Sequence, residues 1–553
     1  MIRAAWVLPA VLVAAGAMAS SSAAADAPDL ILAGGKVFTA DPARPWAEAL
    51  AIAGDHVVAV GTSAEVRPLA GPATRVIELQ KRVVVPGFND AHTHVGGGLG
   101  PAVNLDLRSN DPALADVLKA LTAEAARAPA GTWLRGEIGV RVLDDPAATR
   151  ATLDPITPNH PVLLTGWTGH GGLLNTAALR ALGVADDEPD PPGGWFGRVR
   201  GTSQLSGIAH EYALFRLERR LGERVPRADA EASVRHYVQE ALKLGITSVQ
   251  DMGTSVTAPA LADLLRAAGA PLRWRVIRFP LEPPSADDAS EGQGRDDKDG
   301  VVVWGRKWIL DGTPVERLAA TRRPYADRPA WTGRLDFSSE EIRAAVEHAR
   351  RDREPLMLHV VGDAAVAAAL SALEATGGPE VWRPLRPRFE HGDGLAPDLV
   401  ARAAALGVTV VQNPSHFTLP EVMFARFGYE NMAGFQPMKS LLAAGVPLAL
   451  GSDGPPSPFL NILFAVTHPT SRREALTREQ AVTAYTRGSA FAEFAETAKG
   501  TLAPGMLADL AVLSQDVFAV EEGRLPETTS VLTIIGGRVV YDAPVTPPER
   551  SPR

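Results

Sequence analysis

The chain has 553 residues, with 55 Lys and Arg, 64 Asp and Glu and no cysteine. The net charge of −9 argues against a nucleic-acid partner, and the lack of cysteine excludes disulfides, thiolate catalysis and cysteine-based zinc sites. A hydrophobic content of 46% with 22% charged residues is typical of a soluble globular protein, long enough for a large catalytic domain and a second unit.

The first residues predict a secretory signal peptide. Positive charge at residues 1–3 precedes an apolar stretch at 4–19 and a small-residue segment that ends at Ala25. A membrane anchor is the alternative, although this run is short for a span of ~20 residues. We expect residues 1–25 to be removed and the mature protein to be periplasmic or secreted, with no membrane span after cleavage.

Both ends of the mature chain predict short strands around Gly-Gly turns. Residues 30–38 and 532–540 each interrupt an apolar run with a glycine pair, as hairpins do. We expect residues 26–82 and 500–545 to form one small β-sandwich domain from both chain ends; two independent caps are the alternative. Residues 83–499 would then form the catalytic domain, with insertions.

The middle of the chain alternates helical and strand patterns. Apolar strand-like runs occur at 83–94, 162–165, 246–250, 274–279, 307–310, 356–361, 388–391, 408–412 and 448–450. Such alternation predicts an α/β fold with a parallel sheet covered by helices, and eight such strands would close as a (β/α)8 TIM-like barrel. An open doubly wound sheet is the alternative, but no Gly-x-Gly-x-x-Gly turn opens a helix after the first strand.

Two irregular segments interrupt this alternation. Residues 281–300 are polar and charged, which indicates a solvated loop. Residues 185–204 are rich in Asp, Pro and Gly and contain Trp195 and Phe196, which suits a lid over a site. The alternative for these aromatic side chains is packing against the barrel rim.

The first predicted barrel strand ends in two histidines, His92 and His94. Side chains two residues apart on an extended chain point to the same side, so both imidazoles can reach one cation. The glycines at 96–98 let the backbone turn away from the site. A His-x-His pair alone is more often not a metal site, so the other strand ends must support it.

Further polar side chains fall at the carboxyl ends of the predicted strands, where barrel active sites gather. They are Lys307, His359, His391 and Asp453. With His92 and His94 they form a suitable ligand set for two zinc-type cations. His170 and His416 also follow strand-like runs and could face the pocket. The other histidines are expected to be structural or solvated: His56, His160, His210, His236, His348 and His468.

With these motifs in this order, the chain resembles the metal-dependent amidohydrolases, specifically amidohydrolase family 3, which includes N-substituted formamide deformylase-like proteins. The resemblance covers nearly the whole mature chain. Besides the His-x-His pair, it depends on Gly-His-Gly at 169–171, Lys307 with Asp-Gly at 311–312, Glu-His-Gly-Asp at 390–393, Gly-Ser-Asp at 451–453 and the tail motif at 499–510.

The resemblance implies a role for each candidate ligand. His92 and His94 would hold one metal ion, His359 and His391 a second, and a carboxylated Lys307 would bridge them, with Asp453 as the last-strand aspartate. Family members often carry Asp before the Gly-His near the second strand, where this chain has Thr168.

This chemistry suits amide hydrolysis. A bridging cation lowers the pKa of bound water towards ~7 and so supplies hydroxide. Burial favours the neutral amine of Lys307, which can react with carbon dioxide to give an anionic carbamate. An ion pair with Asp311 or a nearby carboxylate is the alternative. Asp453 is the predicted proton shuttle, or alternatively a helix N-cap, and His170 would polarise the substrate carbonyl.

The sequence therefore predicts a secreted hydrolase with two divalent metal ions, most simply zinc, that cleaves a non-peptide C–N bond of a small molecule. The predicted substrate pocket is lined by Trp167, Trp195, Phe196, His416 and Phe417, with rim packing as the alternative for the aromatic residues. An esterase or lactonase that uses the same site is a second hypothesis. A non-catalytic metal- or ligand-binding protein is a third, and a homo-oligomer is left open.

Overall fold

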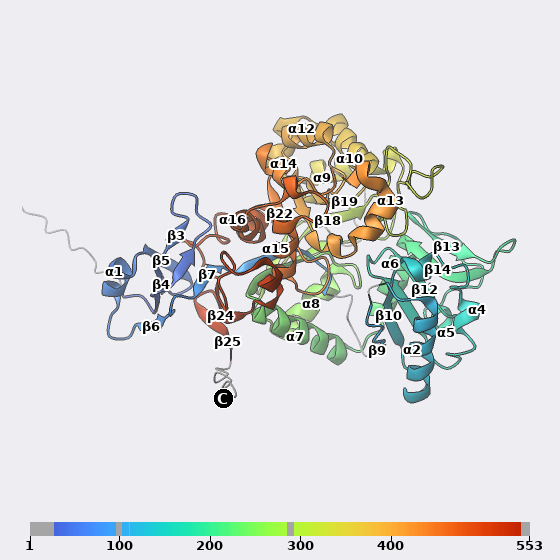
Figure 1. The fold of residues 1–553 in the computed structure, drawn as a ribbon, viewed down its shortest axis with the longest axis horizontal. Coiled ribbons are helices and arrows are strands. Elements are labelled where there is room, and N and C mark those ends of the chain that lie inside the picture. The colour runs from blue at the N-terminus through green and yellow to red at the C-terminus, as the bar shows by residue number, and fades with distance from the viewer. Residues whose placement is uncertain are drawn as a thin grey trace, which may run out of the picture.

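The computed structural model describes residues 27–543 except 96–101, 110, 285–291, 293 and 433. The expected signal peptide and the glycines at 96–98 lie outside the described residues. Figure 1 shows a β-rich end formed by both termini, a central barrel and an inserted domain on the other side. Within the described ranges, no helix combines the length and apolarity needed to cross a membrane.

The central barrel confirms the predicted α/β fold. Its strands pair in parallel in the order β22-β21-β20-β19-β18-β16-β15-β8. They are β8 (Phe88–Thr93), β15 (Ile246–Asp251), β16 (Arg273–Arg278), β18 (Val301–Ile309), β19 (Leu356–Val360), β20 (Arg388–His391), β21 (Thr409–Gln412) and β22 (Leu448–Leu450). The strands are almost entirely buried, as expected for a parallel sheet with helices on its outer face.

The barrel nearly closes between β22 and β8. The backbone N–H of Asp453 donates to the carbonyl of His92 at 2.8 Å, and the N–H of Ser452 donates to the Asp90 carboxylate at 2.8 Å. At Gly451 a Cβ atom would lie only 2.5 Å from the His92 nitrogen, so glycine permits this close approach. The closure places the end of β8 beside the end of β22.

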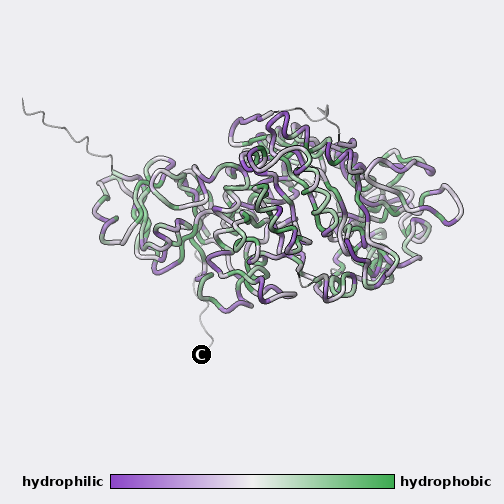
Figure 2. Tube along the Cα trace, turned by 90° about the horizontal axis from the view of Figure 1, so that it is seen from above, coloured by the Kyte–Doolittle hydropathy of each residue, from purple (hydrophilic) through white to green (hydrophobic). Residues whose placement is uncertain are grey.

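Helices between successive strands cover the barrel. They include α7 (Arg227–Lys243), α8 (Ala258–Ala268), α9 (Ser339–Asp352), α10 (Asp363–Thr376), α12 (Pro397–Leu406) and α15 (Pro458–Thr467). The sequence of α9 shows why such a segment forms a helix and packs on the barrel. Ser338 and Glu341 form a capping box that starts the helix. Ile342, Ala345 and Ala349 form a buried apolar stripe at helical spacing. Figure 2 shows hydrophobic segments concentrated inside the molecule and hydrophilic segments outside.

A second sheet is inserted between β8 and β15. It has six strands in the order β13-β14-β12-β11-β10-β9. The strands are β9 (Val103–Asn104), β10 (Leu134–Ile138), β11 (Val162–Gly166), β12 (Gly171–Leu174), β13 (Gly194–Arg198) and β14 (Leu205–Glu211). The expected strand at 162–165 therefore forms, but its assignment to the barrel is wrong. An apolar run predicts a buried strand without specifying its neighbours, and β8 pairs directly with β15.

Two further sheets combine the chain ends. One has the order β5-β4-β1-β6, and the other has the order β25-β24-β23-β7-β2-β3. Their strands are β1 (Leu30–Ala33), β2 (Lys36–Phe38), β3 (Trp46–Ala47), β4 (Ala49–Ala53), β5 (His56–Gly61), β6 (Arg75–Glu78), β7 (Val83–Pro86), β23 (Leu510–Leu513), β24 (Ser530–Ile535) and β25 (Arg538–Asp542). One apolar cluster joins both sheets and includes Leu32, Leu50, Val84, Leu510 and Ile534.

Candidate active site

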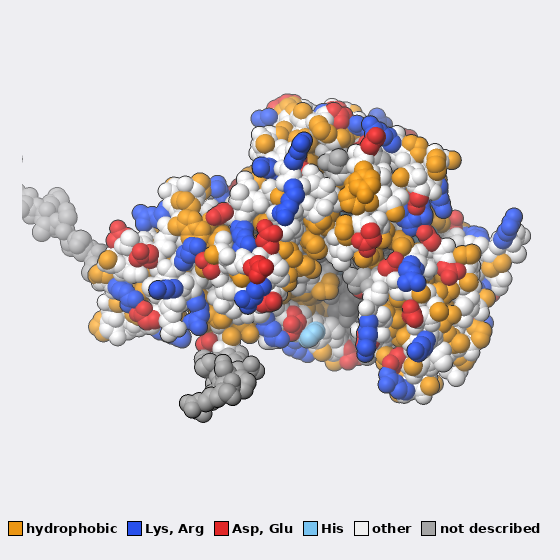
Figure 3. Space-filling view, viewed as in Figure 1, with side chains coloured by type: hydrophobic (Ala, Val, Ile, Leu, Met, Phe, Trp, Pro, Cys, Tyr) orange, Lys and Arg blue, Asp and Glu red, His pale blue; other side chains and the backbone are white. Residues whose placement is uncertain are grey.

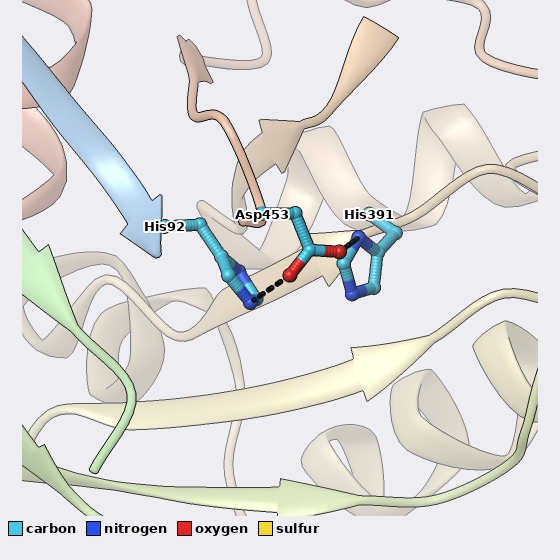
Figure 4. Close-up of side chains that lie close together, drawn as sticks. All are labelled: His92, His391 and Asp453. Carbon is cyan, nitrogen blue, oxygen red and sulfur yellow. Dashed lines mark ion pairs between the residues drawn. The ribbon is translucent and has the colours of Figure 1, made fainter. Parts of the chain in front are cut away.

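The closure of the barrel brings His92 and Asp453 together, as Figure 4 shows. Asp453 Oδ1 lies 3.3 Å from His92 Nε2 and 3.2 Å from His94 Nε2, and Asp453 Oδ2 lies 3.9 Å from His391 Nδ1. One ligand atom from each of His92, His391 and Asp453 falls within 4.8 Å of the others. Asp453 has a left-handed backbone with φ of 51°, an uncommon conformation that concentrates at functional sites.

Lys307 reaches the same cluster from β18. Its Nζ lies 3.1 Å from His92 Nε2, and the side chain is buried. Burial lowers the pKa of this amine to about 8. Asp311 does not pair with it: the Asp311 carboxylate instead accepts backbone N–H groups from Ala320, Val361 and Gly362. Within the described ranges, no carboxylate oxygen forms an ion pair with Lys307, so this alternative for the lysine is wrong.

His359 and His391 lie on the neighbouring strands β19 and β20. Their ring centroids are 4.4 Å apart. The Nδ1 of His391 bonds to Asn413 Oδ1 at 2.9 Å, whereas the buried Nε2 of His359 has no hydrogen-bond partner among the described residues. Burial lowers the pKa of both rings well below the usual value and that of His94 to about 4. These rings are therefore neutral at pH 7, the form that binds metal.

The donor set fits divalent metal ions. It combines neutral imidazoles, one carboxylate and a buried amine, and an orphaned imidazole nitrogen would gain a partner. Zinc is compatible with nitrogen and oxygen donors of this kind. His92, His94, Lys307, His359, His391 and Asp453 all come from the carboxyl ends of barrel strands or the residues just beyond them.

Carboxylates form hydrogen bonds with the Nδ1 atoms of several of these imidazoles. Glu390 Oε2 lies 2.6 Å from His92 Nδ1, with both side chains fully buried. The Nε of Arg388 donates to Glu390 at 2.9 Å. Although burial opposes ionisation, the charge of Arg388 and the hydrogen bond from His92 lower the pKa of Glu390 to about 2. A carboxylate that orients a metal-binding histidine fixes its tautomer and ring position.

The same arrangement recurs at His170 and His416. Glu211 Oε2 lies 2.8 Å from His170 Nδ1, and Asp393 Oδ2 lies 2.9 Å from His416 Nδ1. Burial opposes a charge on His416, but Asp393 and then Asp453 outweigh it and raise its pKa to about 10. His416 is thus an imidazolium whose Nε2 lies 3.2 Å from Asp453 Oδ2.

Sequence reasoning assigned no role to Glu211, Glu390, Asp393 or Asn413. The sequence could have indicated Glu390 and Asp393, because each is a carboxylate in the same buried motif as His391. Glu211 had no local signal, since it meets His170 only through the pairing of β12 with β14.

These residues open onto a cavity of about 290 Å³ between the barrel and the inserted sheet. Its polar wall includes His170, His359, His391, His416 and Asp453. Burial lowers the pKa of His170 to about 4, and its ring lies 4.7 Å from that of His359. The structure therefore places His170 and His416, which could face the pocket according to the sequence, at the cavity with the predicted ligands.

Only some of the expected pocket aromatics line this cavity. Trp167 does. Trp195 instead stacks on His210 with centroids 5.0 Å apart, and the Arg334 guanidinium lies 4.3 Å from its ring. Phe196 is buried in the core of the inserted domain, and Phe417 packs in another apolar cluster. These three side chains therefore do not line the cavity as predicted: Trp195 stacks on a histidine, and Phe196 and Phe417 are buried in apolar clusters.

Comparisons with known proteins agree with this geometry. The sequence profile described as "Amidohydrolase family" matches residues 75–541. N-substituted formamide deformylase of Arthrobacter pascens is 28% identical, over 93% of this chain and 98% of its own. Protein LONG AFTER FAR-RED 3 of Arabidopsis thaliana is 27% identical, over 93% of this chain and 91% of its own. The crystal structure of an uncharacterized metal-dependent hydrolase from Pyrococcus horikoshii shares the fold, with a TM-score of 0.70, 24% identity, and coverage of 89% of this chain and 99% of that one.

Proposed function

The chain belongs to the amidohydrolase family, and from this premise we propose that it is a secreted, binuclear metal-dependent hydrolase that cleaves an amide-type C–N bond of a small molecule. One observation carries the proposal: Asp453 and Lys307 both lie within 3.3 Å of His92 Nε2, beside the buried, neutral rings of His359 and His391. Such a cluster is costly to bury unless it binds something.

We assign two ligand groups within this cluster. His92 and His94 would hold one zinc ion and His359 and His391 the other, with a carboxylated Lys307 shared between them. The buried amine of Lys307 forms no ion pair with a described carboxylate, and this supports carboxylation, since a neutral amine is the form that adds carbon dioxide. When bound, such ions supply a hydroxide near neutral pH and polarise the scissile carbonyl.

Asp453 is the proposed proton carrier. Its Oδ1 would accept the proton of the attacking water, and the same carboxyl group would donate a proton to the leaving nitrogen. His416 fixes this carboxylate through Oδ2, and Asp393 holds His416 in turn. The left-handed backbone at Asp453 aims its side chain towards the histidines of the cluster.

His170 is the proposed donor to the substrate carbonyl, and Glu211 determines which of its nitrogens carries the proton. Burial and then the neighbouring carboxylates Glu316 and Asp311 raise the pKa of Glu211 well above its usual value. A protonated Glu211 donates its O–H to His170 Nδ1. The neutral imidazole then carries hydrogen on Nε2, the atom left to donate to an oxyanion.

A matched pair of substrates tests this function. N-benzylformamide and benzyl formate differ only in the atom that leaves, so they separate amidase from esterase activity. We expect zinc-loaded protein to hydrolyse the amide, to lose this activity on chelation and to regain it with added zinc. Hydrolysis of the ester alone would favour the esterase hypothesis, and inactivity on a panel of both classes would contradict the proposal. Cell fractionation with and without residues 1–25 tests secretion.

A further inference from the structure

The inserted sheet supplies one wall of the cavity, and this wall carries a carboxylate without a partner. Glu137 lies on β10 and lines the cavity together with Trp167, Thr168 and His170. Its residue is exposed, and no hydrogen bond or ion pair involves its side chain within the described part of the chain. The Glu137 carboxylate is therefore available to a molecule that enters the cavity.

The pairing of β10 with β11 places Glu137 and Trp167 close together. Glu137 is in register with Thr165, and the backbone N–H of Trp167 donates to the carbonyl of Ile138 at 3.0 Å. Trp167 directly follows β11, which ends at Gly166, and both Trp167 and Glu137 line the cavity. The carboxylate and the indole ring thus form one surface of the cavity.

The charged side chains that line the cavity favour a ligand with a positive charge. Three carboxylates line it, those of Glu137, Asp393 and Asp453, against one charged imidazole, that of His416, and the described lining residues include no Lys or Arg. Asp393 is paired with His416, and Asp453 with the histidine cluster. Glu137 is the one of these three carboxylates without a partner among the described residues, and it lies on the inserted sheet rather than at a barrel strand end.

Trp167 supplies the second, independent observation. Its indole Nε1–H is buried and has no hydrogen-bond partner among the described residues, although the ring borders the cavity. An oxygen acceptor on the bound ligand, separate from any cationic group, would satisfy this donor. The neighbouring wall is apolar, with Val315, Met423 of α13 (Pro420–Met432) and Leu460.

We propose that Glu137 and Trp167 form a subsite for a cationic group, a quaternary or protonated amine, which the substrate carries away from its scissile bond. An anionic side chain beside an aromatic face is the combination that recognises ammonium groups. This inference rests on the proposed function, because it names the class of amide that the same site takes. The apolar wall would contact the spacer between the cation and the amide.

Two formamides that differ only in charge test the subsite: N-[4-(trimethylammonio)benzyl]formamide and N-(4-tert-butylbenzyl)formamide. We expect the zinc-loaded protein to prefer the cation in kcat/KM. Glu137→Gln should lower the ratio of cation to neutral kcat/KM by about fivefold, mainly through KM, the size expected of one solvent-accessible ion pair. Glu137→Lys should reverse the preference. Glu223→Gln, an exposed position outside the cavity, is the matched control and should leave the ratio unchanged.

A binding measurement separates this inference from the proposed function. Calorimetry with the benzyltrimethylammonium ion and with benzyl alcohol reports charge selectivity without turnover. Binding of the cation that Glu137→Gln weakens, in protein that hydrolyses neither formamide, would support the subsite and contradict the hydrolase. Hydrolysis of both formamides with a ratio that neither Glu137 variant changes would overturn the subsite and leave the hydrolase standing.

Discussion

Replacement of Glu390 by glutamine tests whether the barrel interior positions His92, a proposed metal ligand. The substitution keeps the shape of the side chain but removes the charge between Arg388 and His92. Both Arg388 and Glu390 are almost completely buried. Glu390→Gln would therefore leave a buried guanidinium without its counter-charge.

The structure sets the expected size of this effect. Breaking a buried ion pair by removing one partner destabilises a protein by about 3–5 kcal/mol. Arg388 keeps its hydrogen bonds to Gln250 Oε1 and to the carbonyl of Ala91, so we expect about 3 kcal/mol. Loss of a carboxylate that orients a ligating histidine weakens metal binding about 10- to 100-fold.

Glu354→Gln provides the matched control. Glu354 pairs with Arg278 at 2.7 Å, both side chains are nearly inaccessible, and neither residue lines the cavity. Urea unfolding of the metal-free proteins should show a similar loss of stability in both variants. Competition with a fluorescent zinc chelator should show weaker zinc binding only in Glu390→Gln. Equal zinc affinity in the two variants would refute the idea that Glu390 positions His92.

Three further predictions concern proton positions in the site. Asp453→Asn should retain bound zinc by mass spectrometry and lose about 10²-fold or more in kcat; wild-type kcat would contradict the shuttle. Glu211→Gln should keep most activity, because the amide N–H of glutamine can also donate to His170 Nδ1. A loss of activity as large as that of His170→Ala would instead show that Glu211 acts as a carboxylate. Burial lowers the pKa of His94 from its ordinary value of 6.5 to about 4 in the folded protein, so the unfolded chain takes up a proton on this residue first as the pH falls. The unfolding free energy of metal-free protein should therefore fall between pH 6.5 and 4, and less steeply in His94→Gln; parallel curves would contradict the assignment.

The barrel and the proposed metal ligands were accessible to sequence reasoning because each strand carries its own signal. His359 stands in an aliphatic run, and Asp453 follows one, so their positions at strand ends could be predicted locally. The parallel topology then requires that such ends converge at one face. The convergence of six residues from five strand ends follows from these two facts.

The partners of these ligands depend on contacts between distant segments, which periodicity does not encode. The strand at 162–165 looked like a barrel strand, but it belongs to the inserted sheet that carries Glu137 and Trp167. Phe417 is adjacent to His416 yet packs into an apolar cluster away from the cavity. Choices of this kind depend on tertiary packing and not on local pattern.

The charge pattern of the surface agrees with the sequence. Figure 3 shows acidic and basic side chains interspersed on the face in view, without a stripe of one sign. This mixture agrees with a composition in which 55 Lys and Arg accompany 64 Asp and Glu.

A crystal structure of the zinc-loaded protein, with data collected on both sides of the zinc absorption edge, tests the central proposal most directly. We predict two anomalous peaks, one beside His92 and His94 and one beside His359 and His391, with continuous density from the Lys307 amine to a carbamate between them. A single peak, zinc bound elsewhere, or a bare Lys307 amine beside two ions would contradict the binuclear, carbamate-bridged site.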